Sequence, residues 1–133
     1  MPARAGAPEV DEVIRAAQEH VLPPLRSHLK SGTRLAESAA ALETLWADIA
    51  DGFTPVPERD SYKPRQARAL VAAARWITAA SLVRAESRGL HRREDLPDTD
   101  SRFDHRILVG GLDQVWTATD PVAPRLLAAE SAA

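Results

Sequence analysis

The feature that most constrains the fold is the segment 64–87, PRQARALVAAARWITAASLVRAES, in which apolar residues recur at helical spacing with no interior Gly or Pro. This pattern predicts one long α-helix. Pro64 suits the first helical turn, and Gly89 favours a stop just beyond the last one. A single helix cannot bury its own apolar stripe, so it needs partner helices. The residues predicted to form the stripe are Leu70, Ala73, Ala74, Ile77, Ala80 and Ser81.

Two further segments have helical spacing. The first runs from Val10 to Val21 and is stopped by Pro23 and Pro24. The second begins near Ser31 or Thr33, which can cap it, and ends near Gly52. Short connections make neighbouring helices antiparallel. The predicted fold is therefore all-α, a three-helix bundle with an irregular C-terminal extension.

The predicted domain organisation has three parts. Residues 1–8 form a flexible arm, residues 9–106 form the helical bundle, and residues 107–133 form an extension with a loose tail. Within and just before the extension, FDHRILVGGLDQVWTA (103–118) places two small apolar groups around a Gly-Gly turn. That arrangement is compatible with a short strand or hairpin.

Composition and absent motifs exclude several functions. The absence of Cys excludes a disulfide scaffold, a Cys-ligated metal and a thiol nucleophile, and it fits a cytoplasmic protein. A formal charge of −2 disfavours binding to nucleic acid. No apolar run reaches the roughly 18–20 residues of a membrane span. No Gly-rich phosphate loop is present, so we expect no dinucleotide to bind in the usual way.

Residues 84–100, RAESRGLHRREDLPDTD, crowd arginines and acids around one Gly and one Pro. Three chemical interpretations compete with a simple charged surface. Glu86 and His91 are a potential acid–base pair. The arginines at 84, 88, 92 and 93 are a potential anion site, with Arg84 and Arg88 spaced as neighbours on one helix face. The potential metal ligands, whose spacing matches no established site, are His91, Asp95, Asp98, Asp100, Asp104 and His105. Mixed charges of this kind more often form a solvated or ion-paired surface.

The same stretch resembles a known family. ESRGLH followed by REDLPDTD is similar to the E-S-R-G-x-H-x-R-x-D-[FY]-P-x-x-D signature of the C-terminal helical domain in the succinate dehydrogenase/fumarate reductase flavoproteins, which include the L-aspartate oxidases. The preceding helical segment and TRLAESAAALETLWADI (33–49) are similar to helices of that domain. The resemblance covers residues 30–106 and implies a three-helix bundle.

The resemblance also implies a role. In the family, the flavin, the substrate-binding arginines and the catalytic histidine belong to other domains. We therefore expect this chain to hold no cofactor and no catalytic residue, with FAD in a partner subunit. The expected function is a non-catalytic small subunit that supports a separate FAD-dependent oxidoreductase of L-aspartate or a related dicarboxylate. Alternatives are an interaction module, a fragment of a longer oxidase and, least favoured, an enzyme using His91 and Glu86. A homo-oligomer is also compatible with the sequence.

The motif residues are interpreted as a partner interface or structural motif. Arg88 carries a rigid fork of donors suited to carbonyls or a carboxylate across an interface, and Glu86 can orient it. Gly89 permits a sharp exit from the helix, and His91 then caps the helix or contacts a partner. Trp46 and Trp76 are interpreted as core or interface anchors. The full set is Glu86, Ser87, Arg88, Gly89, His91, Arg93, Asp95, Pro97 and Asp100.

Overall fold

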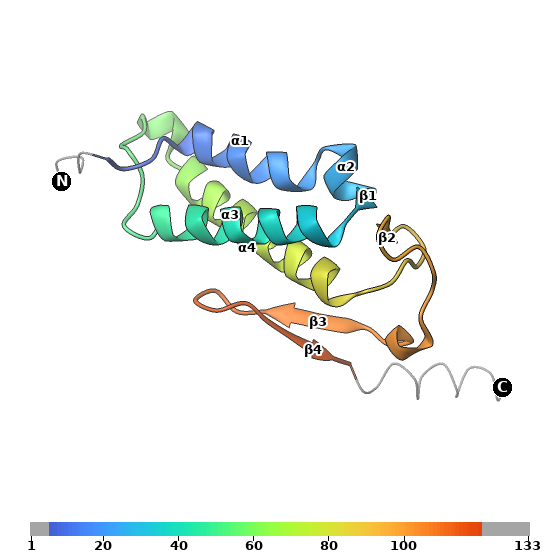
Figure 1. Ribbon diagram of the computed structural model, residues 1–133. Coiled ribbons are helices and arrows are strands. Elements are labelled where there is room, and N and C mark those ends of the chain that lie inside the picture. Colours follow the sequence, from blue (N-terminus) through green and yellow to red (C-terminus); the bar gives the residue numbers. More distant parts are fainter. Residues whose placement is uncertain (1–5, 121–133) are drawn as a thin grey trace.

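The computed structural model describes residues 6–120 and contains three long helices packed together (Figure 1). These are α1 (Val10–Val21), α3 (Gly32–Asp48) and α4 (Lys63–Val83). Successive helices run antiparallel, and α4 packs against both of the others. The predicted three-helix bundle is confirmed.

The core lies where the three helices meet. Val13 and Ala17 of α1 pack with Ile49, which follows α3, and with Ala67 and Val71 of α4. Ile49, Ala17, Ala67 and Val71 are fully buried. The small alanines allow the helix axes to approach closely.

The ends of α3 follow the local signals of the sequence. The side chain of Ser31 accepts a hydrogen bond from the Arg34 N–H at 3.3 Å, as an N-cap does. The helix ends at Asp48, and Gly52 adopts a positive φ of 112° in the turn that follows. Gly52 therefore lies in the turn beyond the helix, a few residues after the helix end that the sequence predicted near it.

The buried face of α4 differs from the predicted stripe. Ala74 and Ser81 are buried as predicted, whereas Ala73 is exposed and the Ile77 side chain is 53% exposed. Alanines occur all round this helix, so the sequence does not identify which stripe faces the other helices. The buried residues are Ala67, Val71, Ala72, Ala74, Arg75, Thr78 and Ser81.

A short connection joins the first two long helices. It contains α2 (Pro24–Ser27) and β1 (Leu29–Lys30). Strand β1 pairs in parallel with β2 (Arg92–Arg93), which follows α4. This pairing places the charged stretch after α4 beside the start of α3. Two 3-10 turns complete the connections, at Glu58–Asp60 and Ser101–Phe103.

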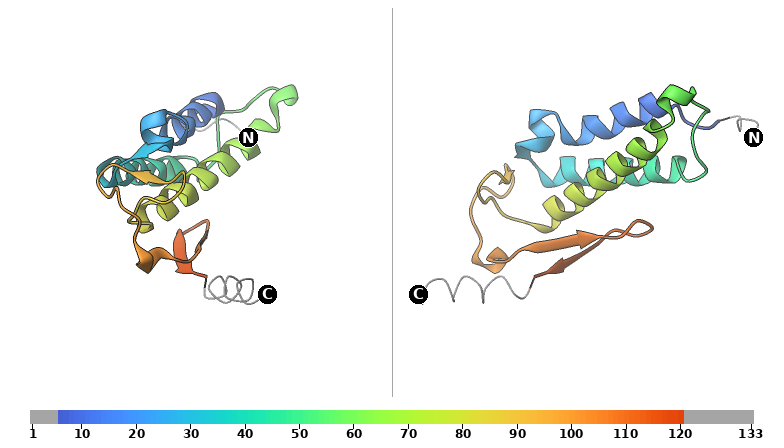
Figure 2. Two further views of the ribbon diagram at one scale, coloured as in Figure 1. Left: turned by 90° about the vertical axis from the view of Figure 1, so that its right-hand side faces the viewer. Right: turned by 180° about the vertical axis from the view of Figure 1, so that it is seen from behind.

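The possible hairpin is confirmed as β3 (Ile107–Gly110) and β4 (Trp116–Thr119), paired antiparallel. The prediction of an all-α protein is therefore wrong in detail, because the fold is mainly helical with two small two-stranded sheets. The predicted irregular extension is a hairpin as far as residue 120, and the predicted tail lies outside the described residues. The hairpin lies on the side of α4 away from α1 (Figure 2).

Two hydrogen bonds attach the hairpin turn to α4. Arg75 Nη1 donates to the Leu112 carbonyl at 2.6 Å, and Trp76 Nε1 donates to the Gly111 carbonyl at 2.7 Å. Gly111 has a φ of +92°, and a Cβ there would lie 1.9 Å from the Gln114 carbonyl oxygen. Glycine is therefore required at this position of the turn.

The two ends of the predicted organisation are only partly described. Residues 1–5 of the predicted arm lie outside the described residues, and the carbonyls of Ala7 and Pro8 accept hydrogen bonds from Thr54. Within residues 6–120, no helix combines the length and apolar character needed to cross a bilayer.

Candidate functional site

The last long helix ends earlier than its sequence suggests. α4 stops at Val83, and Arg84 is its C-cap with a ψ of 81°, outside the helical region. Arg84 and Arg88 are therefore not neighbours on a helix face, and that prediction is wrong. Beyond this point the chain turns inward, and the carboxylate of Glu86 accepts hydrogen bonds from Arg84, Arg88 and the Asp100 N–H.

Glu86 is the centre of the site. Its side chain is completely buried, and Oε1 accepts from Arg84 Nη1 at 2.7 Å and from Arg88 Nε at 2.8 Å. Oε2 accepts from the Asp100 N–H at 2.7 Å. The hydrogen bonds from Arg88, then from the Asp100 N–H and Arg84, lower the pKa of Glu86 to about 2, against the opposing effect of burial. Glu86 is therefore ionised at neutral pH and poorly suited to general acid–base catalysis.

The two arginines carry this network to the segment before the hairpin. Arg84 donates to the carbonyls of Phe103 at 3.0 Å and His105 at 2.7 Å. Arg88 pairs with the carboxylate of Asp104. One buried carboxylate and two guanidinium groups thus hold the end of α4 against the start of the β3–β4 hairpin.

Ser87 organises the loop that follows. Its side chain is buried, and its Oγ accepts from the Arg93 N–H at 2.8 Å and donates to the Leu96 carbonyl at 2.8 Å. The Ser87 N–H donates to the Asp98 carbonyl at 3.0 Å, and its carbonyl accepts from Thr99 Oγ1 at 2.9 Å. The compact hydroxyl at this position therefore closes the loop 87–99 on itself.

The predicted helix stop, Gly89, lies in a tight turn beyond the helix, with a φ of +57°. The turn is closed by Arg88 N–H to the His91 carbonyl at 2.8 Å and His91 N–H to the Arg88 carbonyl at 3.0 Å. Leu90 forms the tip and is 90% exposed. His91 Nε2 donates to the Arg84 carbonyl at 2.9 Å, and burial lowers the pKa of the imidazole. The ring is therefore neutral at pH 7.

Arg93 and Asp95 join this loop to the beginning of α3. The buried Arg93 forms a two-pronged pair with Asp95, Nε to Oδ1 at 2.9 Å and Nη2 to Oδ2 at 2.8 Å. Asp95 Oδ2 also accepts from the Gly32 N–H at 3.0 Å. The Arg93 guanidinium, followed by this N–H, holds the pKa of Asp95 well below its usual range. Arg34 pairs with Glu94 beside them.

The remaining two motif residues have lesser roles in the network. Pro97 is exposed. Asp100 contributes its N–H to Glu86, while its side chain accepts from the Arg102 N–H at 2.9 Å and caps the 3-10 turn. We call the nine residues together the 86–100 motif: Glu86, Ser87, Arg88, Gly89, His91, Arg93, Asp95, Pro97 and Asp100.

This arrangement bears on each chemical interpretation of the sequence. Glu86 and His91 have different partners and form no acid–base pair. Arg84, Arg88 and Arg93 are each matched by a carboxylate, and Arg92 is exposed on β2, so the four arginines do not form one open anion site. No three His, Asp or Glu side chains in residues 6–120 are grouped to hold a metal.

In the part of the chain that the structure describes, every buried side-chain nitrogen and oxygen has a hydrogen-bond partner.

Sequence reasoning missed two structural centres. One is Arg75, whose buried guanidinium bonds Glu43 through two 2.8 Å contacts and stacks 4.7 Å from the centre of the Trp46 ring. A lone arginine within an Ala-rich stripe was the available signal. The other is a cluster in which His20 and Arg26 both hydrogen-bond the Ser38 hydroxyl. The spacing of these three residues in the sequence gives no signal of the cluster.

Comparison with known proteins places the 86–100 motif inside a region that matches a known family. Residues 29–123 match the protein family described as "Fumarate reductase flavoprotein C-term". The chain is also similar to an L-aspartate oxidase of Rhodospirillum rubrum, with 40% identity over 78 residues, which is 59% of this chain and 24% of that protein. The match thus spans about a quarter of the length of this relative.

Proposed function

Because the chain belongs to the family of fumarate reductase flavoprotein C-terminal domains, we propose that it is a non-catalytic helical subunit of a separate FAD-dependent oxidoreductase. The subunit packs on the flavin-binding polypeptide and supports it. The proposed substrate is L-aspartate or a related dicarboxylate, because the similar full-length protein is named an L-aspartate oxidase. One observation carries the proposal. Residues 29–123 match the C-terminal domain of a flavoprotein family.

The 86–100 motif is suited to holding an exposed side chain in a fixed position for a partner. Most of its charged side chains form hydrogen bonds that hold the chain around Glu86, so the loop is preorganised. The turn at its surface carries Leu90, which is 90% exposed although the turn is closed by two backbone hydrogen bonds. Moving a leucine side chain from water into an apolar contact is worth about 1.5–3 kcal/mol. We infer that Leu90 inserts into the flavin-binding subunit.

The direct test is reconstitution with a flavin-binding polypeptide that lacks this domain and is encoded next to this chain. The expected result is co-elution in size-exclusion chromatography, flavin absorbance in the complex, and more hydrogen peroxide from L-aspartate than the flavin polypeptide forms alone. A colourless chain that binds no such polypeptide would contradict the proposal. So would flavin absorbance in the purified chain by itself. Binding that leaves oxidation unchanged would favour a plain interaction module, and a reading frame continuous with a flavin domain would favour a fragment of a longer oxidase.

Leu90→Asp is expected to weaken binding of that polypeptide about tenfold or more, because a charge would replace the inserted apolar group. Circular dichroism should stay unchanged, since the wild-type side chain is almost entirely solvated. Leu22→Asp is the matched control, because Leu22 is 64% exposed and lies at the end of α1. Arg88→Ala should weaken binding or lower stability. Equal affinities of Leu90→Asp and the wild type would exclude Leu90 as the contact.

A further inference from the structure

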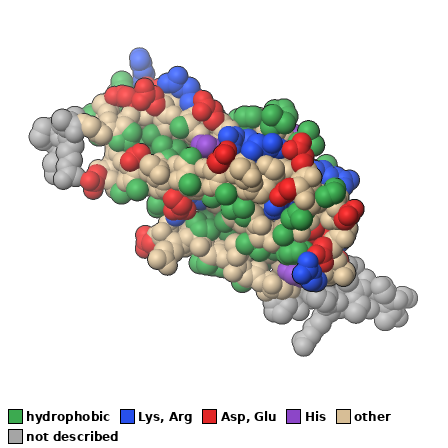
Figure 3. Space-filling view, in the orientation of Figure 1, with side chains coloured by type: hydrophobic (Ala, Val, Ile, Leu, Met, Phe, Trp, Pro, Cys, Tyr) green, Lys and Arg blue, Asp and Glu red, His purple; other side chains and the backbone are tan. Residues whose placement is uncertain are grey.

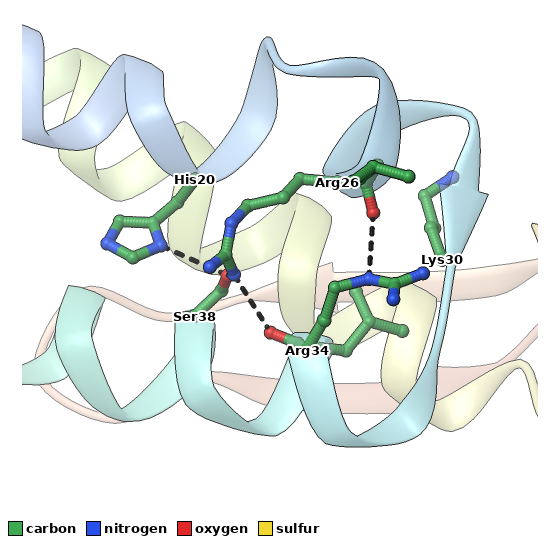
Figure 4. Close-up of a pocket in the computed structure, with 7 residues that line it drawn as sticks. His20, Arg26, Lys30, Arg34 and Ser38 are labelled. Carbon is green, nitrogen blue, oxygen red and sulfur yellow. Dashed lines mark hydrogen bonds between the residues drawn. The ribbon is translucent and has the colours of Figure 1, made fainter.

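A second group of polar side chains lies where the end of α1 meets α2, β1 and α3 (Figure 4), next to the strand pair that joins β1 to the 86–100 motif. Two adjoining hollows share His20, Arg26, Lys30 and Leu35 in their walls. Both hollows are small, and their empty volumes of about 170 and 400 Å³ include space that is open to solvent. Basic side chains and a histidine gather on this face of the molecule, with acidic side chains around them (Figure 3).

Arg26 is the cation at the centre of the group. Its Nη1 donates to the Ser38 hydroxyl at 2.5 Å and to the Arg34 carbonyl at 3.2 Å. The side chain is half-buried, and no carboxylate in residues 6–120 forms an ion pair with it. Its Nε and Nη2 donors take no part in these bonds. A half-buried guanidinium without a counter-charge is unfavourable, and an anion would relieve it.

His20 lies on the other side of the buried Ser38 hydroxyl, 3.0 Å from its oxygen through Nδ1. The hydroxyl accepts from Arg26, so its own hydrogen is free to bond His20 Nδ1. In the tautomer in which Nδ1 accepts that hydrogen, the imidazole proton lies on Nε2, which is then a donor. Burial and then the neighbouring Arg26 lower the pKa of His20, against Glu19, so the ring is neutral at pH 7.

Lys30 adds a second cation to the walls of both hollows. Its ammonium forms no hydrogen bond or ion pair in the described part of the chain, and burial lowers its pKa. Arg34 lines only the smaller hollow and is already paired with Glu94. Neither hollow has an acidic residue in its wall. The larger one is completed by the hydroxyl-bearing residues Thr78 and Ser81.

We propose that the two adjoining hollows form one binding site for a small oxyanion, either a phosphate or a short dicarboxylate. Arg26 and His20 hold the anion, and Lys30 lies at the rim. The free donors of Arg26 and the Nε2–H of His20 supply directed hydrogen bonds to the anion oxygens. Lys30 supplies charge. The limited volume selects small anions over nucleotides. The site involves no flavin and no partner subunit, so it stands independently of the proposed function.

The test uses the whole chain and two probes, inorganic phosphate and succinate, in isothermal titration calorimetry at constant ionic strength. The expected result is saturable binding of at least one probe, with no such signal from sodium chloride. Arg26→Gln should weaken binding about tenfold or more, because a charge-assisted hydrogen bond is lost. Lys30→Gln should weaken it less and removes no hydrogen bond of the folded chain. Arg65→Gln, an exposed arginine of the first turn of α4, is the control and should bind as the wild type does.

Circular dichroism establishes that each variant is folded before its affinity is compared. A loss of affinity in either folded variant, with none in Arg65→Gln, supports the site. Binding of phosphate alone or of succinate alone also supports it and identifies the kind of anion. The proposal is overturned if neither probe binds saturably, or if Arg26→Gln and Lys30→Gln both keep the wild-type affinity.

Discussion

Glu86→Ala is expected to lower the free energy of unfolding by about 3 kcal/mol, the lower end of the cost of breaking a buried ion pair. Removal of the carboxylate leaves Arg84, Arg88 and the Asp100 N–H without their shared acceptor. The cost stays at the lower end because the Arg88 side chain is 38% exposed and keeps part of its hydration. Urea denaturation followed by circular dichroism measures the change. Asp104→Ala, which removes a 63% exposed partner of Arg88, is the control and should cost under about 1 kcal/mol.

Glu86→Gln tests the charge separately from the shape. The folded pKa of about 2 lies below the ordinary value of 4.5, so this carboxylate stabilises the fold fully above pH 4.5. That contribution is lost as the pH falls from 4.5 towards 2. The variant should therefore be less stable at pH 7 and lose less stability over this acid range than the wild type. Identical acid-unfolding profiles would show that Glu86 does not carry this role.

Arg75→Ala is expected to cost about 2–3 kcal/mol and to loosen the hairpin from α4. The side chain is 1% exposed and forms the pair with Glu43, the bond to the Leu112 carbonyl and the contact with the Trp46 ring. Hydrogen bonds of a charged group and a cation–π contact together reach this size, reduced because Glu43 is 53% exposed and regains water. Urea denaturation measures the stability. Hydrogen exchange should show faster exchange in β3 and β4.

Two comparisons make the Arg75 prediction specific. Arg75→Lys should restore little, because an ammonium cannot reproduce the fork that meets both oxygens of Glu43. Arg68→Ala is the matched control on the same helix. Arg68 lies over the Phe53 ring at 5.6 Å and makes a long 3.4 Å hydrogen bond, so its loss should cost under about 1 kcal/mol. Unchanged hairpin exchange in Arg75→Ala would show that the turn is held by other contacts.

Much of the helical fold was predictable because its signals are local. Pro23 and Pro24 end α1 because proline lacks the N–H donor that a helix needs, and Ser31 caps α3 by accepting from the Arg34 N–H. The hairpin was foreseen only as a possibility, because four-residue strands carry a weak pattern. The pairing of Leu29–Lys30 with Arg92–Arg93 was not foreseen, since two-residue strands so far apart in sequence have no periodicity to detect.

The candidate site was likewise predictable only in part. The contiguous ESRG motif was sufficient to indicate the family, which the match over residues 29–123 then showed. Its internal geometry was not predictable. Arg84 and Arg88 were expected on one helix face, but the helix ends at Val83 and both arginines turn to the same buried carboxylate.

The sequence by itself determined the number of long helices, where they begin, and the family. These properties depend on backbone propensities, caps and a contiguous motif. The tertiary structure alone decided which side of α4 is buried, that Glu86 is a buried ion-pair centre, and that Arg26 lies half-buried without a carboxylate partner in the described residues. Each depends on contacts between segments distant along the chain. Burial and charge pairing are set when those segments pack, and the linear order of the residues does not contain that information locally.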